Sequence, residues 1–290
     1  MATPAADSLR SRRSLLFVPG AEPRKLERAR EAVADVVLLD LEDSVAPPQK
    51  EEARSLVADT IRAGGFVGEA AVRLNAPDTA YFEADLAAVL GAGARTVMIP
   101  KSESPETLAE VARAAARLAG GECVDLLALV ETPLGIARAL DVARAGVAAL
   151  CFGHADFALQ MGLGEADASR GVVYHARCNL VIAARAGGVT PIDSVYLAVK
   201  DDDGFRAETD AGRMLGFEGK LCIHPRQVEI ANEVYTPGPA EIDKAKRVLE
   251  AWRSRDRGSA VLTVDGKMVD APLVAVQERV LERARRAGVA

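Results

Sequence analysis

The stretch VVLLDLED at residues 36–43 predicts the architecture of the chain, because an uninterrupted apolar run is followed at once by three acids. Its first four residues are all Val or Leu, which is typical of a strand buried on both faces. Asp40, Glu42 and Asp43 then crowd the end of that strand. Charges placed only where a buried strand stops are poorly explained as part of a core, so they indicate a functional edge.

The same arrangement recurs along the chain. Apolar runs predict eight strands, at residues 14–19, 36–42, 71–75, 96–101, 124–131, 149–153, 191–197 and 220–225. Segments with helical periodicity lie between them, and one, at 104–121, has Ser104 as an N-cap and Pro105 at its first position. Eight strand–helix units predict an α/β fold, the (β/α)8 TIM barrel. The carboxyl ends of such strands meet at one rim, where active sites are built, so we expect an enzyme.

The chain is expected to have three parts: a flexible N-terminal tail at 1–13, the barrel at 14–238 and a C-terminal extension at 239–290. The extension is longer than closure of the barrel requires. It is predicted to contain a helix at 239–258, a hairpin that turns at Asp265 and Gly266, and a helix at 271–288. An appendage with its own hairpin serves either for packing or as a lid.

Composition excludes several classes of protein. The chain of 290 residues has an apolar fraction of 49%, which is ample for one large core. A net charge of −6 and few aromatic residues argue against binding to nucleic acid. No stretch is long and apolar enough to predict a membrane span, and the four cysteines lack metal-type spacing. We therefore expect reduced thiols and a cytoplasmic protein.

Glu131 and Asp156 form the most informative pair, because each follows an apolar run and the two strands are neighbours. Their carboxylates can therefore meet at the rim. Hard divalent cations such as Mg²⁺ take one or two carboxylates together with substrate and water oxygens, and Mn²⁺ accepts the same ligands. The alternative is that both acids are solvated or paired with arginines at the rim.

Arg73, on the third predicted strand, is a candidate to bind a substrate carboxylate and stabilise a developing oxyanion. The alternative is a buried salt bridge with the acids at the end of the second strand, and both can hold together. Asp40 and Glu42 alternate onto one side of their strand and are candidates for the water shell of a metal. For Asp43, capping of the helix that starts near Pro47 is the simpler interpretation.

Other strand-end residues give weaker predictions. Lys101 could form a Schiff base with a carbonyl substrate, but a rim lysine paired with an acid is more common. His224 could help to hold a ligand, although a hydrogen-bonded structural histidine is the commoner case. His154 lacks a second ligand at zinc spacing. The chain also lacks the GxSxG and Walker motifs, which disfavours serine hydrolases and P-loop proteins.

Eight motifs occur in the order found in one known family. They are RRSLLFVPG (12–20), DVVLLDLEDSVAP (35–47), VRLN (72–75), VMIPK (97–101), ALVETPLG (128–135), GHADFA (153–158), GKLCIHPRQV (219–228) and DGKMVDAP (265–272). Together they resemble the citrate lyase β-subunit-like family, which includes malyl-CoA, β-methylmalyl-CoA and citramalyl-CoA lyases. The resemblance extends from Arg13 to about Ala284. One departure is GHAD, where relatives commonly carry an acid at the position of Ala155.

The resemblance implies a metal site and a substrate contact. Glu131 and Asp156 match the family's Mg²⁺ ligands, and Arg73 matches the arginine that contacts the substrate oxygens. Glu42 and Asp43, beside them, are expected to belong to the catalytic site.

The resemblance also implies a site for coenzyme A, as part of the substrate. The turn from Phe17 through Pro19, with Arg24, is similar to the stretch that holds the CoA nucleotide. Ile223 and His224 resemble the residues that line the thioester arm.

Asp270 matches an aspartate that relatives present to the active site of a neighbouring subunit, so the extension is expected to be a lid that acts in a homotrimer or hexamer. The implied activity is Mg²⁺-dependent cleavage of a 3-hydroxy-dicarboxylic acyl-CoA to a 2-oxo acid and acetyl- or propionyl-CoA. Three alternatives remain open at this stage. They are a citryl-acyl-carrier-protein lyase subunit, a malyl-CoA thioesterase, and an aldolase for 2-keto-3-deoxy acids that does not use CoA.

Overall fold

The computed structural model describes residues 10–164, 167–255 and 260–290. The chain forms two compact units, one from Arg12 to Asn232 and one that includes Glu233–Ala290. Most of the predicted N-terminal tail, residues 1–9, lies outside the described residues. At its end, Arg13 binds Asp35 with a 2.7 Å ion pair, so the ordered barrel begins slightly before its predicted start.

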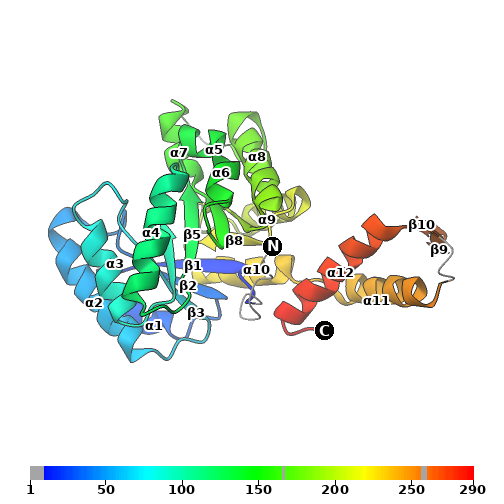
Figure 1. Ribbon diagram of the computed structural model, residues 1–290, viewed down its shortest axis with the longest axis horizontal. Helices are drawn as coiled ribbons and strands as arrows, with labels where there is room; N and C mark the ends of the chain where they lie inside the picture. Colours follow the sequence, from blue (N-terminus) through cyan, green and yellow to red (C-terminus); the bar gives the residue numbers. More distant parts are fainter. Residues whose placement is uncertain (1–9, 165–166, 256–259) are drawn as a thin grey trace. The chain divides into compact units, whose positions relative to one another are not determined.

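Eight parallel strands close into a barrel in sequence order, which confirms the predicted fold (Figure 1). The strands are β1 (Ser14–Pro19), β2 (Val36–Asp40), β3 (Glu69–Arg73), β4 (Thr96–Ile99), β5 (Asp125–Val130), β6 (Ala149–Phe152), β7 (Thr190–Asp193) and β8 (Gly219–Cys222). Most end earlier than the apolar runs predict. The final charged residues therefore lie in the loops beyond the strands, at the rim.

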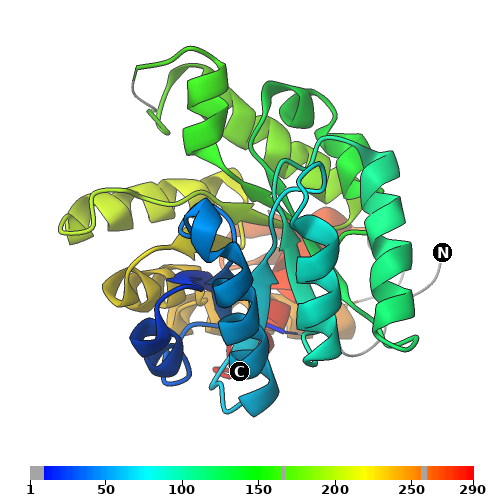
Figure 2. The ribbon, with the colours of Figure 1, turned by 90° about the vertical axis from the view of Figure 1, so that its left-hand side faces the viewer.

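Helices surround the strands of the barrel (Figure 2). They are α1 (Pro23–Ala29), the 3₁₀ turn η2 (Pro47–Gln49), α2 (Lys50–Ala63), α3 (Phe82–Gly91), α4 (Pro105–Leu118), α5 (Pro133–Ala137), α6 (Ala139–Ala143), α7 (His154–Gln160), α8 (Gly171–Gly187), α9 (Asp202–Leu215) and α10 (Pro225–Tyr235). The predicted cap of α4 is present, since Ser104 accepts the Thr107 N–H. None of the helices within the described ranges is both long and apolar enough to cross a lipid bilayer.

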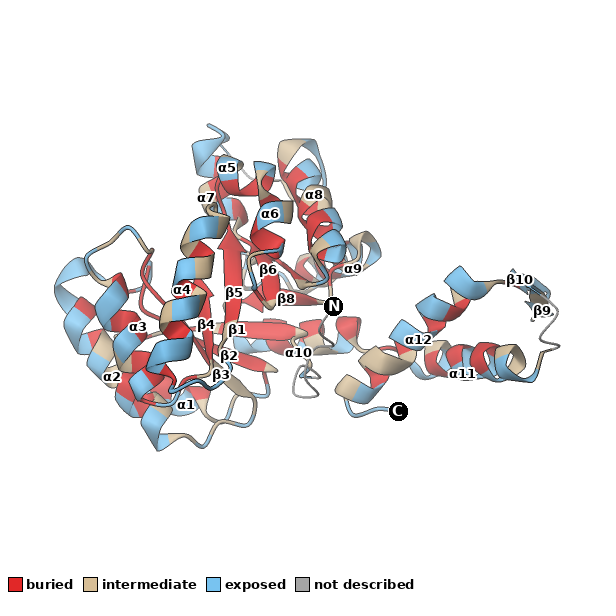
Figure 3. Ribbon diagram, in the orientation of Figure 1, coloured by how far each residue is buried: buried red, intermediate tan, exposed pale blue. Residues whose placement is uncertain are grey.

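The core of the barrel is built by side chains that the strands direct inward. Figure 3 shows the strands as an almost continuously buried band. Leu15, Leu38, Met98, Leu127 and Cys151 belong to one buried cluster there, and all are fully shielded from solvent. A filled interior of this kind supports the site at the rim without leaving a channel through the barrel.

The register of the first three strands sets the geometry of the rim. Pro19 pairs with Asp40, and Asp40 pairs with Arg73, so these three residues lie side by side at the ends of β1, β2 and β3. Gly20 follows directly, and a side chain there would place its Cβ 2.5 Å from the Asp40 carbonyl oxygen. Glycine is thus required for the close approach of the β1 and β2 ends.

The C-terminal unit has the predicted order of helix, hairpin and helix. It consists of α11 (Pro239–Ser254), β9 (Leu262–Val264), β10 (Lys267–Val269) and α12 (Ala271–Arg286). Asp265 and Gly266, both with positive φ, form the predicted turn. Val248 of α11, Val269 and Val274 of α12 share a small apolar cluster, so this unit has a core of its own.

Candidate active site

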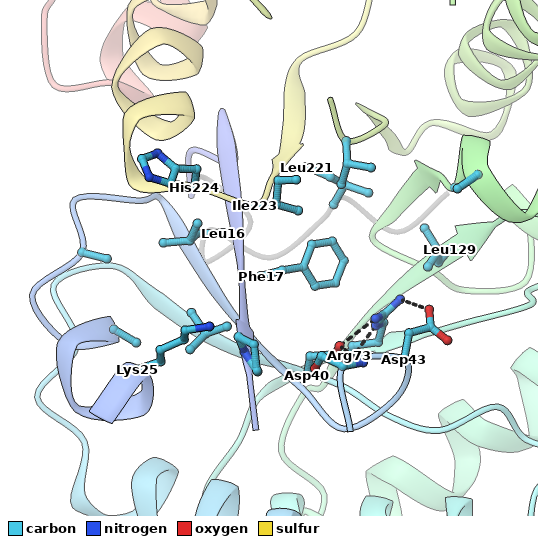
Figure 4. A pocket seen from close by; sticks show the side chains of 18 of the residues that line it. Leu16, Phe17, Lys25, Asp40, Asp43, Arg73, Leu129, Leu221, Ile223 and His224 are labelled. Carbon is cyan, nitrogen blue, oxygen red and sulfur yellow. Dashed lines mark hydrogen bonds and ion pairs between the residues drawn. The ribbon is translucent and has the colours of Figure 1, made fainter. Parts of the chain in front are cut away.

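A cavity of about 1000 Å³ opens at the carboxyl ends of the barrel strands (Figure 4). It is lined by residues on or just after β1, β2, β3, β5, β6 and β8, and by the start of the loop after β7. Nine of the predicted site residues that lie in the barrel unit form part of this lining: Phe17, Pro19, Asp40, Asp43, Arg73, Glu131, Asp156, Ile223 and His224. The cavity is therefore the candidate active site.

Arg73 is held rigidly at the wall of this cavity. Its Nε and Nη2 each donate a 2.7 Å hydrogen bond to Asp40, and Nη1 lies 3.1 Å from both Glu42 and Asp43. The guanidinium also lies over the Phe17 ring at 4.7 Å from its centroid. The buried salt bridge considered as an alternative is thus present, and Arg73 lines the cavity at the same time.

The two carboxylates nearest Arg73 have opposite electrostatic environments. Burial opposes ionisation of Asp40, but the hydrogen bonds and charge of Arg73 outweigh it and hold the pKa of Asp40 below its usual value. Burial raises the pKa of Glu42 to about 8, with Arg73 acting against this and Glu131 adding to it. Glu42 Oε2 is also buried without a hydrogen bond among the described residues. Glu42 is therefore an acid that can hold or give up a proton near neutral pH.

Asp43 does not cap a helix, and that interpretation of the sequence is wrong. The N-cap position of η2 is Ala46, which offers no side-chain cap. Asp43 instead turns toward the cavity and accepts a hydrogen bond of 3.1 Å from Arg73 Nη1 (Figure 4). The guanidinium, fixed by Asp40, provides a stronger partner than the end of a short 3₁₀ turn.

Glu131 follows β5 and is almost fully buried, at 3% exposure. Its Oε1 accepts a 2.8 Å hydrogen bond from the backbone N–H of Lys101. Burial raises the pKa of Glu131 to about 7; the Lys101 N–H acts against this, and the charge of Asp156 adds to it. Within the described residues neither Glu131 nor Asp156 forms an ion pair, so both retain capacity for a cation.

Gly153 makes room for Glu131. A Cβ at this position would lie 2.5 Å from Glu131 Cβ and 2.7 Å from its Oε2. Residue 153 joins β6 to α7, the helix that carries Asp156, so a glycine here allows the two carboxylate-bearing segments to approach. No signal in the sequence distinguishes this glycine from one needed for a turn.

A buried lysine supports the loop that carries Glu42. Lys50 Nζ donates to the carbonyl oxygens of Leu41 and Glu42, each at 2.7 Å, and to Asn75 Oδ1 at 2.6 Å. Asn75 is in turn bound to Asp85. These bonds fix the backbone beyond β2, and the sequence analysis did not identify Lys50.

Three predicted residues of the barrel unit, Arg24, Glu42 and Lys101, are not among those that line the cavity. Arg24 is exposed on α1 and does not line it, whereas Lys25 and Arg28 of the same helix do. Lys101 does not line it either, and it contributes through its backbone. Asp270 lies in the C-terminal unit, where its side chain caps α12 by accepting the Leu273 N–H.

The loop after β8 also contributes to the lining of the cavity. Ile223 and His224 both line the cavity, and Nδ1 of His224 accepts the Arg226 N–H at 3.2 Å. His224 is thus both the hydrogen-bonded structural histidine and a lining residue. The sequence analysis did not identify His154 as a lining residue. It is buried, at 9% exposure, and begins α7 two residues before Asp156. Burial lowers the pKa of His154.

A known family accounts for this arrangement of barrel and rim. The family model described as HpcH/HpaI aldolase/citrate lyase matches residues 13–225, which is most of the chain and nearly the whole barrel unit. The chain belongs to this family. The resemblance drawn from the eight motifs is confirmed, as is the expectation of an enzyme of the lyase class.

Proteins that are similar to this chain differ in their named activities. The chain is 35% identical over 289 residues to citrate lyase subunit beta of Escherichia coli K12, which covers 97% of this chain and 95% of the relative. It is 38% identical over 261 residues to the (3S)-malyl-CoA thioesterase of Cereibacter sphaeroides, with 89% of each chain covered. Membership of the family therefore leaves the substrate open.

Solved structures of the family are similar over most of their length. CitE from Mycobacterium tuberculosis, in complex with magnesium, acetoacetate and coenzyme A, gives a TM-score of 0.78 at 34% identity and covers 94% of this chain and 97% of that one. A citrate lyase beta subunit from the same organism, complexed with oxaloacetate and magnesium, gives a TM-score of 0.69 at 33% identity, over 80% of this chain and all of that one.

Proposed function

We propose that this protein is a Mg²⁺-dependent carbon–carbon lyase. Its substrate is a 3-hydroxy-dicarboxylic acyl-CoA such as citramalyl-CoA, malyl-CoA or β-methylmalyl-CoA. The products are a 2-oxo acid and acetyl- or propionyl-CoA. The observation that carries the proposal is the pair Glu131 and Asp156, two carboxylates that form no ion pair with any described residue and share the cavity wall with a fixed arginine.

The residues present fit a hard divalent cation. Burial raises the pKa of Glu131, and the charge of Asp156 raises it further. Glu42 is also buried, and its pKa is also raised. No group of three or more His, Cys, Asp and Glu side chains in the described part of the chain forms a metal-ligand cluster. Two carboxylates with substrate and water oxygens suit Mg²⁺, which seldom has an all-protein ligand set, and Mn²⁺ is the alternative.

Glu131 and Asp156 would hold the cation. When bound, it lowers the pKa of the substrate's 3-hydroxyl and neutralises its carboxylate. Arg73, fixed by Asp40, would bind the oxygens of the departing oxo acid from the cavity wall. Glu42, with a pKa of about 8, holds or releases a proton beside Arg73, and Asp43 keeps Arg73 in position.

The CoA part of the substrate would occupy the remainder of the cavity. Phe17 and Pro19 of β1 and Ile223 and His224 beyond β8 line a continuous wall for the thioester arm. The nucleotide phosphates need a basic group, and Arg24, the candidate from the sequence motif, does not line the cavity. Lys25 and Arg28 of the same helix do line it, and we propose that they bind the phosphates.

Asp270 is proposed as the acid that protonates the enolate carbon, or removes that proton in the condensing direction. It would act in the site of a neighbouring copy, so that the unit from residue 239 onward serves as a lid in a homotrimer or hexamer. This assignment rests on the match of the VDAP motif.

A second candidate is a thioesterase that releases a free hydroxy acid and CoA. It is favoured by the relative with that activity at 38% identity. A citryl carrier-protein lyase subunit is the corresponding alternative from the citrate lyase relatives. An aldolase without CoA is disfavoured by the basic cavity wall on α1.

Product analysis tests the proposal. Purified protein is incubated with each of the three acyl-CoA esters, with Mg²⁺ or after chelation, and oxo acid, acyl-CoA and free CoA are measured. We expect metal-dependent oxo acid in equal amount to acetyl- or propionyl-CoA. Free CoA with a hydroxy acid would identify a thioesterase, and inert esters would point to carrier-bound substrates.

A further inference from the structure

His154 is a buried polar residue on the cavity wall, and its side chain has no hydrogen-bond partner in the part of the chain that the structure describes. It begins α7 directly after β6, two residues before Asp156, and is 9% exposed. Its Nδ1 is buried without a hydrogen-bond partner among the described residues. No hydrogen bond within those ranges involves Nε2 either, and this ring nitrogen is left for the cavity that His154 lines.

Such a residue points to a ligand. Burying an imidazole costs free energy unless hydrogen bonds replace the lost water, so buried polar groups are nearly always paired. The charged groups that act on His154 are Glu208, Lys220, Asp193 and Arg177. Among them, Asp193 binds Arg177 at 2.6 Å and Lys220 binds Glu208 at 2.8 Å. These groups satisfy one another and leave the imidazole unpaired. Nε2, which unlike Nδ1 is not among the fully buried unpartnered atoms, can gain a partner from a ligand in the cavity.

The position of His154 indicates which substrate atom it meets. Arg73 comes from β3, and His154 follows β6, so the two lie well apart around the barrel, with the cation ligands at β5 and α7. Around His154 the wall is apolar, with Phe152, Val195 and Leu221. A thioester arm lying along β8 brings its carbonyl between this wall and the cation site.

We propose that His154 donates a hydrogen bond from Nε2 to the thioester carbonyl oxygen of the bound acyl-CoA. This inference rests on the proposed lyase function. In the cleavage step Glu42, as its carboxylate, takes the proton of the 3-hydroxyl, whose C–O bond becomes the carbonyl of the 2-oxo acid. The bond between the carbinol carbon and the carbon next to the thioester breaks at the same time. The electron pair moves into the thioester, whose oxygen becomes an enolate, and a proton then returns to the carbon. His154 stabilises that oxygen.

The donor role does not depend on a change of protonation state, because Nε2 carries a proton in one neutral tautomer and in the imidazolium. His224 is a second donor on this cavity, because its Nδ1 accepts the Arg226 N–H and its Nε2 therefore carries a proton.

The test compares His154→Leu, His154→Gln and, as a matched control, His175→Leu, an exposed histidine on α8 outside the cavity. Two rates are measured for each: kcat for acyl-CoA cleavage, and deuterium exchange into the methyl group of acetyl-CoA, which reports enolate formation alone. We expect His154→Leu to lower both by about 10²–10³-fold with KM changed less than threefold. Gln, which retains a donor, should recover at least tenfold, and His175→Leu should match the wild type.

Two failures are distinguishable. Wild-type protein that cleaves none of the esters overturns the proposed function and this inference with it. Wild-type protein that is active while folded His154→Leu stays within threefold in both rates overturns this inference alone. So does a Gln variant no faster than Leu, because a packing role would not discriminate between them. Folding and Mg²⁺ binding of each variant are checked by thermal shift.

Discussion

The backbone N–H of Lys101, just after β4, donates a 2.8 Å hydrogen bond to Oε1 of Glu131, just after β5. Lys101 adopts φ of 49°, a left-handed conformation that is uncommon for a residue other than glycine. That conformation directs its N–H at the carboxylate. The strain is local, and it orients the side chain that we propose as the principal cation ligand.

Replacement of Glu131 by Gln tests the cation site. The amide keeps the shape and the Lys101 contact but loses the charge, so Mg²⁺-dependent turnover should fall at least about 10³-fold. Glu122→Gln, at an exposed surface ion pair with Arg95, is the matched control and should keep wild-type activity. Turnover of Glu131→Gln within tenfold of the wild type would remove Glu131 from the metal site.

The stability of the metal-free protein should fall as the pH rises. Folding raises the pKa of Glu131 to about 7 and of Glu42 to about 8, from a usual value of 4.5. Both folded-state values lie above the unfolded one, so this contribution to stability is complete below about pH 4.5 and is lost as the pH rises through 7 to 8. Thermal unfolding in chelator, from pH 5 to 8.5, measures it.

Mg²⁺ should reverse this trend, because a cation binds the ionised carboxylates. At a concentration about 100 times its dissociation constant, Mg²⁺ should raise Tm by about 5–10 °C at pH 8 and much less at pH 5.5. The Glu131→Gln variant should lose most of the increase. An increase that is equal at both pH values would contradict the site.

Gly153→Ala tests the close approach between β6 and Glu131. The added Cβ would lie 2.5 Å from Glu131 Cβ, so the carboxylate must move, and we expect kcat to fall about 10²-fold. Gly91→Ala, where a Cβ meets nothing within 4 Å at the end of α3, is the control and should be neutral. Unchanged kcat in Gly153→Ala would show that the position of Glu131 is not critical.

Asp270→Asn separates a chemical role from a structural one. Asp270 caps α12, and Asn is an equally good N-cap, so Tm should stay within about 2 °C. Deuterium exchange into acetyl-CoA should nevertheless fall about 10²–10⁴-fold, because the amide cannot transfer the proton. Mixing this variant with an Arg73→Ala variant should restore activity if Asp270 acts in a neighbouring copy. Normal exchange in Asp270→Asn would exclude the role.

Lys50→Met should destabilise the barrel by at least about 2 kcal/mol, since it leaves three buried acceptors without their donor. Lys200→Met, at an exposed position, should change stability by less than about 0.5 kcal/mol. Urea unfolding followed by circular dichroism compares the two. Equal stability of both variants would mean that Lys50 is dispensable for the loop after β2.

Much of the site was predictable because its residues are tied to strand ends. The apolar runs identified all eight strands, and the strand-end candidates Arg73, Glu131, Asp156 and His224 lie on the cavity, whereas Lys101 contributes only its backbone N–H. Arg24 is the instructive exception. It sits on a helix, where neighbouring positions point about 100° apart, so a motif places the helix at the site without deciding which cation faces it. Lys25 and Arg28 face it instead.

The sequence by itself determined the barrel, the positions of the strand ends and the hairpin at Asp265 and Gly266, because periodicity, caps and turns depend on residues close together in the chain. Only the tertiary structure decided that Asp43 binds Arg73 rather than a helix end and that Gly153 leaves space for Glu131. It also decided that His154 Nδ1 is buried with no hydrogen-bond partner among the described residues. Each of these depends on distances between segments far apart in sequence, which packing of the whole barrel sets and no local pattern encodes.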